Sequence, residues 1–164
     1  MRWIAGIICA ALLTTSSAMF LATREPWFKA KQPAPRTGLP IEDCGLMHDI
    51  ISVQLSSCSS IPCTLQRGTD VTVVVEFSAN GASSLPSMKH EVYFILNFVK
   101  TKATIMPDTC DGIYCPLHVD NGLRFTATMH VSSSLPALRG TLHWELLNES
   151  KQAVLCYKLL ISIN

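Results

Sequence analysis

The chain has 164 residues, of which 48% are hydrophobic and 15% charged, with 13 basic and 12 acidic side chains. This length accommodates one domain plus a short additional segment, and the charged fraction is well below the roughly 25% of an ordinary globular domain. The balanced charge argues against a nucleic-acid partner, because phosphate binding needs clustered cations. The apolar content argues against disorder.

The N-terminal segment has the features of a secretory signal peptide. Arg2 precedes an uncharged run at 3–13, and small residues follow as far as Ala18. A basic start, a short apolar run and small residues before a cleavage point are typical of such a segment. The alternative is an uncleaved membrane anchor, but most of the flanking positive charge follows the run, against the orientation that an outside domain requires. We therefore predict a signal peptide at 1–18 and a secreted, extracellular protein, with the lysosome as the alternative destination.

Residues 19–42 are rich in proline, with four prolines between Pro26 and Pro40. Proline fixes φ and removes a backbone donor, so this lead is expected to be extended or mobile. The folded domain is then predicted to span 43–164.

Short apolar stretches with a period of two fill the rest of the chain. They lie at 50–55, 69–78, 90–99, 123–131, 142–146 and 155–163. Turn residues such as Gly68, Asn80–Gly81, Asn121–Gly122 and 148–151 separate them. A period of two indicates strands, and no stretch has the 3.6-residue period of a helix. The sequence therefore predicts an all-β protein, an antiparallel β-sandwich.

Cleavage of the signal peptide would remove one of the seven cysteines and leave six. They are Cys44, Cys58, Cys63, Cys110, Cys115 and Cys156. An even number in a secreted chain indicates disulfides. Two pairs share the spacing C-x4-C and could each close a small loop, although six cysteines allow fifteen connectivities. Zinc is the alternative, but four-ligand zinc sites usually contain closer C-x2-C pairs.

The neighbours of these cysteines resemble the Niemann–Pick type C2 family, which belongs to the ML (MD-2-related lipid-recognition) domains. The matching residues are Asp43-Cys44-Gly45, Ser57-Cys58 through Pro62-Cys63 with Leu65-x-x-Gly68, Pro107-Asp108-x-Cys110, Cys115-Pro116-Leu117, Trp144-Glu145-Leu146 and Leu155-Cys156-Tyr157. The resemblance implies an immunoglobulin-like sandwich of two antiparallel sheets with an apolar cavity between them. It also implies the disulfides 44–156, 58–63 and 110–115, and a lipid ligand between the sheets.

The resemblance also implies which residues contact the lipid. Val131 and Leu135 match positions at the mouth of the family's pocket, and Trp144 matches a tryptophan beside the cavity. Phe125, Phe94 and Leu55 fall where further cavity residues are expected. Without the resemblance, an alternating apolar face would be interpreted as ordinary core.

The loop at 99–107 departs from the family's sterol binders. It contains one proline and no aromatic residue, together with Lys100 and Lys102. This departure puts cholesterol itself in doubt. The two lysines could meet a fatty-acid carboxylate or an anionic membrane, or they could simply keep the loop soluble.

No catalytic or metal site is predicted. The five histidines lack metal-ligand spacing, and neither a G-x-S-x-G motif nor a glycine-rich phosphate loop is present. Asn148 begins the only N-x-[ST] sequon, in a predicted turn, so we expect glycosylation there.

We therefore expect a lipid-binding and lipid-transfer protein for a sterol or similar lipid, without cofactor or catalysis. The alternatives are a carrier of fatty acids or other small hydrophobic ligands, and a secreted interaction module that presents lipid to a receptor. A monomer is expected, with transient contact to a membrane or to a membrane protein that accepts the lipid.

Overall fold

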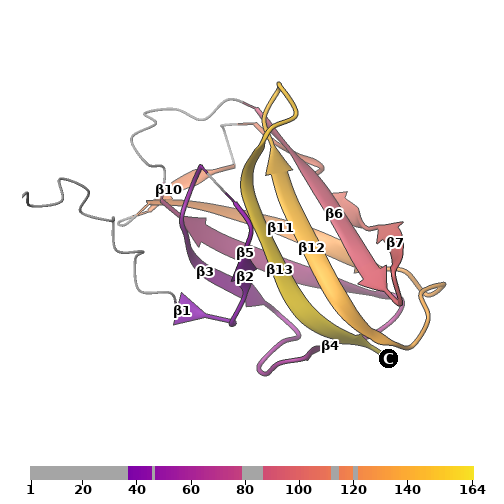
Figure 1. Cartoon of the computed structure of the whole chain (residues 1–164). Helices are drawn as coiled ribbons and strands as arrows, with labels where there is room; N and C mark the ends of the chain where they lie inside the picture. The colour runs from indigo at the N-terminus through magenta and orange to yellow at the C-terminus, as the bar shows by residue number, and fades with distance from the viewer. Residues whose placement is uncertain (1–36, 46, 79–86, 112–114, 120–121) are drawn as a thin grey trace, which may run out of the picture. The chain divides into compact units, whose positions relative to one another are not determined.

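The computed structural model describes residues 37–45, 47–78, 87–111, 115–119 and 122–164. These residues form a sandwich of two sheets without any helix (Figure 1). This confirms the predicted all-β class and the two-sheet architecture. The predicted signal peptide, the lead as far as residue 36 and the turn at Asn80–Gly81 lie outside the described residues.

The strands divide between two sheets. The first sheet contains, in spatial order, β1 (Thr37–Gly38), β3 (Ile50–Leu55), β5 (Thr69–Phe77), β11 (Gly122–Val131) and β10 (Leu117–Val119), with β8 (Thr104–Met106) also paired to β11. The second sheet contains β2 (Glu42–Asp43), β13 (Ala153–Ile163), β12 (Arg139–Leu147), β6 (Met88–Leu96) and β7 (Val99–Lys102), with β4 (Cys63–Leu65) paired to β13 and β9 (Thr109–Cys110) paired to β6. Pairing is antiparallel except for β1 with β3 and β4 with β13.

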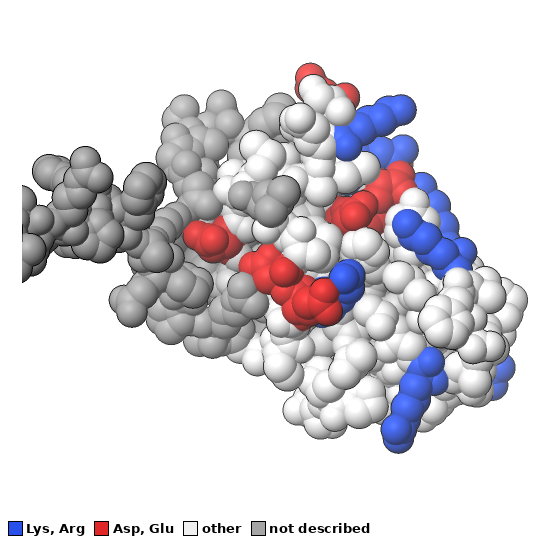
Figure 2. All heavy atoms as spheres, viewed as in Figure 1, with Lys and Arg blue, Asp and Glu red and all other residues white. Residues whose placement is uncertain are grey.

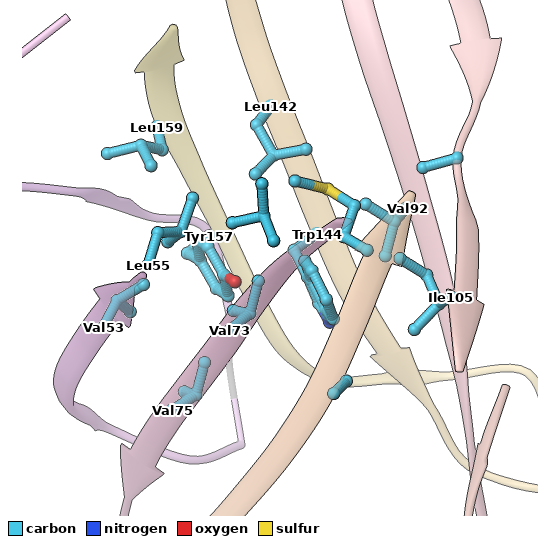
Figure 3. Close-up of a cluster of buried hydrophobic side chains, with 14 of the residues drawn as sticks. Val53, Leu55, Val73, Val75, Val92, Ile105, Leu142, Trp144, Tyr157 and Leu159 are labelled. Atoms are coloured by element: carbon cyan, nitrogen blue, oxygen red, sulfur yellow. The ribbon is translucent and has the colours of Figure 1, made fainter. Parts of the chain in front are cut away.

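The predicted period of two places one apolar face of each long strand inside the sandwich. On β11, the residues from Leu123 to Val131 alternate between buried and more exposed positions. β6 and β12 of the second sheet show the same alternation, whereas four consecutive residues of β13, from Val154 to Tyr157, are buried. Figure 3 shows the result, with valines of β3 and β5 facing the rings of Trp144 and Tyr157.

The predicted strand at 90–99 is two strands joined by a tight hairpin. β6 ends at Leu96, β7 begins at Val99, and these two residues pair with each other. The loop residues Asn97 and Phe98 have φ angles of +45° and +66°. Two-residue hairpin loops favour positive φ at both positions, which asparagine tolerates and phenylalanine rarely adopts. Of the two loop residues, only asparagine is therefore typical of such a turn.

Residues 37–42, which we assigned to the lead, belong to the folded unit. β1 pairs with β3, and the backbone N–H of Leu39 donates to the carbonyl of Val53 at 3.0 Å. Leu39 and Ile41 pack against the hydrophobic core. The predicted boundary at residue 43 therefore lies inside the sandwich, because the last residues of a proline-rich segment add strands to both sheets.

Candidate functional site

The six residues predicted to contact a ligand all lie in the interior of the sandwich. They are Leu55 on β3, Phe125 and Val131 on β11, Phe94 on β6, Trp144 on β12, and Leu135 in the loop that follows β11. Each is at most 4% exposed. The structure therefore brings these residues together in one interior, and their contact with a lipid stays a prediction.

Aromatic rings join the two sheets at the centre of this interior. Phe125 of the first sheet stacks on Trp144 of the second, with ring centroids 6.0 Å apart. Trp144 in turn stacks on Tyr157, also at 6.0 Å and with an interplanar angle of 9° (Figure 3). Side chains of the two sheets are thus in contact at this level of the interior, where an apolar cavity was expected. A lipid at this level would need these rings to move apart.

His90 is a member of this aromatic group that the sequence analysis weighed only as a metal ligand. Its ring lies 5.0 Å from the ring of Phe125 and 5.4 Å from that of Trp144. The residue is 3% exposed, and burial lowers the pKa of its imidazole to about 4. Its place in the alternation of β6, in phase with Val92 and Phe94, was the signal that could have located it inside.

A hydrogen bond fixes the tautomer of His90. The indole Nε1–H of Trp144 donates to its Nδ1 at 3.1 Å. Because an indole nitrogen only donates, Nδ1 must be the unprotonated nitrogen of the neutral ring. The proton therefore resides on Nε2, which is buried and has no hydrogen-bond partner among the described residues.

Tyr157 is a second buried polar group that the sequence analysis did not select. Its side chain is fully buried and its hydroxyl has no partner among the described residues. Burial raises the pKa of this phenol well above its ordinary value. Two donors without a partner among the described residues thus flank Trp144. Such groups are expensive to bury without a partner.

One pocket of about 410 Å³ opens where β6 and β8 approach each other from opposite sheets. Its lining residues are Lys89, His90, Lys102, Ala103, Thr104, Ile105 and Asp108. Ala103 and Ile105 are both 7% exposed and form its apolar side. His90 is therefore one of the residues that line this pocket at the edge of the sandwich.

A second pocket of about 580 Å³ lies on the outer face of the second sheet. It contains Glu91 and Glu145, which face each other across β6 and β12, together with Tyr93 and three lysines. Figure 2 shows basic side chains along the β6–β7 side of this face and acidic ones nearer its centre. The mixed charge distinguishes this pocket from the apolar interior.

Lys100 and Lys102, predicted to lie in a loop, are on strand β7 and already have partners. Lys100 lies over the ring of Tyr93, with its ammonium 3.7 Å from the centroid. Lys102 donates to Glu91 at 3.0 Å, and the hydroxyl of Tyr93 donates to the same carboxylate at 2.8 Å. These hydrogen bonds lower the pKa of Glu91, the bond from Lys102 being the largest cause. Both lysines therefore lie on the outer face of β6 and β7.

Phe98 protrudes at the tip of the β6–β7 hairpin. It is 98% exposed, and Val99 beside it is 63% exposed. A bulky aromatic residue at a positive φ gains no packing energy in this position. The tip is consequently an apolar point on the surface, with the two lysines of β7 close behind it in the sequence.

The three disulfides implied by the resemblance are present. The Cα–Cα distances are 4.9 Å for Cys44–Cys156, 5.2 Å for Cys58–Cys63 and 4.7 Å for Cys110–Cys115. The first disulfide joins segments 112 residues apart. His143 lies beside it, with Nε2 3.4 Å from the sulfur of Cys156. Because both sulfurs are bonded to each other, this group offers no thiolates for zinc.

Asn148 lies between β12 and β13 and closes their connection. Its Oδ1 accepts the backbone N–H of Gln152 at 2.9 Å, and its Nδ2 donates to the side-chain oxygen of that residue at 3.3 Å. A glycan would replace one of the two Nδ2 hydrogens and leave the Oδ1 bond intact. Glycosylation at Asn148 stays a prediction.

In the part of the chain that the structure describes, we find no helix with the length and apolar character needed to cross a membrane.

Comparison with known proteins locates the chain in a family. A family model described as the ML domain matches residues 38–163. Among curated relatives, the NPC intracellular cholesterol transporter 2 of Danio rerio is 32% identical over 124 residues, covering 74% of this chain and 82% of the relative. The Bos taurus protein of the same name is 30% identical over 125 residues, covering 74% and 83%.

A solved structure shares the fold. The Niemann–Pick type C2 protein from the Japanese carpenter ant superimposes with a TM-score of 0.62 at 23% identity, covering 77% of this chain and 100% of that one. The chain therefore belongs to the Niemann–Pick type C2 family of ML-domain proteins, which are secreted or lysosomal lipid-binding proteins and not enzymes.

Proposed function

We propose that this protein is a secreted lipid carrier that holds a sterol or a similar apolar lipid between its two sheets and releases it to an acceptor. The observation that carries the proposal is the interior itself, where the inner faces of both sheets supply apolar and aromatic side chains to one continuous core. The curated relatives are named as cholesterol transporters.

Entry of a lipid between the sheets requires a local change in packing. The Phe125–Trp144 contact fills the centre, whereas the pocket between β6 and β8 already reaches the interior from the edge. A lipid that enters at this edge would separate β8 from β6, which belong to different sheets and share no ladder hydrogen bonds in the described residues. A bound lipid would then replace the side-chain contacts that are lost and stabilise the fold by mass action.

The exposed hairpin tip fits a transient contact with a membrane. Phe98 offers an aromatic side chain that loses no packing contacts on entering a membrane. Lys100 supplies a cation behind it, while Lys102 is paired with Glu91. Anionic lipid attracts such cations at about 1 kcal/mol each near the surface. Contact through this tip would bring the sandwich to the membrane from which the lipid is taken or to which it is delivered.

The filled centre of the sandwich also supports the alternative function. If the sheets never separate, the fold acts as a secreted interaction module, and the apolar tip at Phe98 contacts a protein receptor. A fatty acid or another slender hydrophobic ligand is the third candidate, since it needs less space between the sheets than a sterol ring system.

Lipid extraction distinguishes these functions. The full chain is expressed in a secretory host, the exported protein is purified, and its extractable lipids are identified by mass spectrometry. A carrier is expected to contain about one lipid per protein, and the identity of that lipid separates sterol from fatty acid. If no lipid co-purifies, and labelled sterol and labelled fatty acid both fail to bind the purified protein, the carrier function is wrong and the module remains.

A further inference from the structure

The buried imidazole of His90 has one nitrogen with a partner and one without. Nδ1 accepts the indole N–H of Trp144, so the proton is on Nε2. His90 is only 3% exposed, and its Nε2 has no acceptor among the described residues. A buried donor without an acceptor destabilises the folded state, and a bound oxygen atom would remove this cost.

His90 also lines the pocket between β6 and β8. The other walls of this pocket are apolar at Ala103 and Ile105, while Lys89, Lys102 and Asp108 lie around it. The backbone of β6 is held there by a hydrogen bond from the N–H of His90 to the carbonyl of Asp108 at 2.9 Å. The buried Nε2 donor thus belongs to a residue that lines a pocket at the edge of the sandwich. A ligand with an apolar body and one oxygen atom could reach this donor once β6 and β8 move apart.

We propose that the Nε2–H of His90 donates a hydrogen bond to the polar oxygen atom, hydroxyl or carboxylate, of an otherwise apolar ligand that enters between β6 and β8. This inference rests on the proposed lipid-binding function. It adds that the Nε2–H of His90 selects ligands that contain an oxygen atom. The donor discriminates against pure hydrocarbons, because they would leave Nε2 unpaired. Cations at Lys89 and Lys102 attract a carboxylate more than a hydroxyl, whereas Asp108 opposes this preference.

The test compares ligands that differ only in the oxygen. Oleic acid and oleyl alcohol are compared with 9-octadecene, and cholesterol with cholestene, by competition for a fluorescent lipid on the full exported protein. Some of these ligand pairs will bind to the wild type. Within each such pair, we expect the oxygenated ligand to bind about five- to ten-fold more tightly than the hydrocarbon. The acid and alcohol arms show whether the oxygen belongs to a carboxylate or a hydroxyl.

His90→Asn is the decisive variant. The asparagine oxygen can take the place of Nδ1 as acceptor for Trp144, but no donor remains at the position of Nε2. The preference for the oxygenated ligand is expected to fall to less than two-fold, while the hydrocarbon affinity changes little. Because the readout is a ratio within each variant, a general loss of stability does not imitate it.

Tyr157→Phe is the matched control. It removes the other unpaired donor beside Trp144 and leaves His90 in place, so it is expected to keep the five- to ten-fold preference. An unchanged preference in His90→Asn, or a lost preference in Tyr157→Phe, would overturn the assignment to His90. Equal affinities of the wild type for the oxygenated ligand and for the matching hydrocarbon would overturn it as well, because Nε2 would then make no hydrogen bond to the ligand. If the wild type binds neither ligand, the lipid-binding function fails together with this inference.

Nitrogen NMR of His90 gives a second, independent readout. In the free protein Nδ1 is expected to show the shift of an acceptor and Nε2 that of a protonated nitrogen. An oxygenated ligand should move the Nε2–H proton downfield by at least 0.5–1 ppm and leave Nδ1 almost unchanged. Movement of Nδ1 alone would show that the ligand disturbs the Trp144 bond instead, which contradicts the proposal.

Discussion

The indole Nε1–H of Trp144 donates to Nδ1 of His90 across two adjacent strands of the second sheet. Both residues are buried, and Phe125 of the opposite sheet contacts both rings. The bond satisfies the only polar atom of the tryptophan side chain in an apolar environment. It also keeps the histidine neutral, because protonation of Nδ1 would remove the acceptor and bury a charge.

The stability of the domain is expected to fall on acidification through His90. Burial lowers the pKa of this group from 6.5 to about 4 in the folded state. Between about pH 6.5 and 4 the imidazole of His90 is therefore protonated in the unfolded chain and neutral in the folded chain. The free energy of unfolding falls as the pH decreases through this range. The difference corresponds to roughly 3 kcal/mol in full. Denaturant titration across pH 7.5 to 4 measures it.

The variant His90→Asn isolates the contribution of His90 to this dependence. His90→Asn should flatten the loss between pH 6.5 and 4 by most of that amount. His48, whose pKa is also lowered by burial, remains in the variant and contributes a smaller loss of the same sign. An unchanged slope in His90→Asn would show that the ring of His90 protonates freely in the folded protein.

Removal of the Cys44–Cys156 disulfide is expected to destabilise the domain more than removal of either small one. The loop it closes spans 112 residues, against 5 for Cys58–Cys63. In the loop-entropy model these constrain the unfolded chain by about 5 and about 2 kcal/mol. The double variants Cys44→Ser/Cys156→Ser and Cys58→Ser/Cys63→Ser are compared by denaturant unfolding. If both double variants lose the same free energy of unfolding, loop entropy is not the main contribution of these disulfides to stability.

Replacement of Phe98 by glycine is expected to have opposite effects on stability and on membrane binding. The φ of +66° at this position is unstrained for glycine and costs an L-residue about 1 kcal/mol, so Phe98→Gly should raise the free energy of unfolding by about that amount. The loss of a 98% exposed aromatic side chain should weaken binding to vesicles with anionic lipid about ten-fold. Co-sedimentation and thermal unfolding measure the two effects.

Phe98→Leu is the control for the hairpin tip. It keeps an apolar side chain at the same positive φ, so it should retain most of the vesicle binding and gain no stability. If Phe98→Gly binds vesicles as tightly as the wild type, the tip does not contact the membrane.

The substitution Leu135→Asp is expected to destabilise the domain. Leu135 matches a position at the mouth of the family's pocket, but its side chain is only 3% exposed. A buried carboxylate without a partner should cost at least about 3 kcal/mol. Leu138→Asp in the same loop, at a residue 44% exposed, should stay within about 0.5 kcal/mol of the wild type. Equal thermal stabilities of the two variants would place Leu135 at a solvent-accessible mouth.

The long strands were predictable because each buries one side of a sheet. On β11 every second residue from Leu123 to Val131 is apolar and buried, and a shift by one residue would expose the whole set, so pattern and register determine each other. The small strands were not predictable, because two or three residues such as Thr37–Gly38 carry no period. They exist only because an edge of a sheet is available for pairing.

The same contrast divides the candidate site. The sequence by itself determined which faces are apolar, which cysteines lie in C-x4-C loops and, by resemblance, six interior residues from Leu55 to Trp144. Only the tertiary structure decided that Phe125 meets Trp144 between the sheets and that His90 turns one nitrogen to the indole and leaves the other unpaired. Alternation along a strand reports which side of a sheet a residue faces, but a contact between two sheets depends on how they pack, and that is set by the side chains of every strand together.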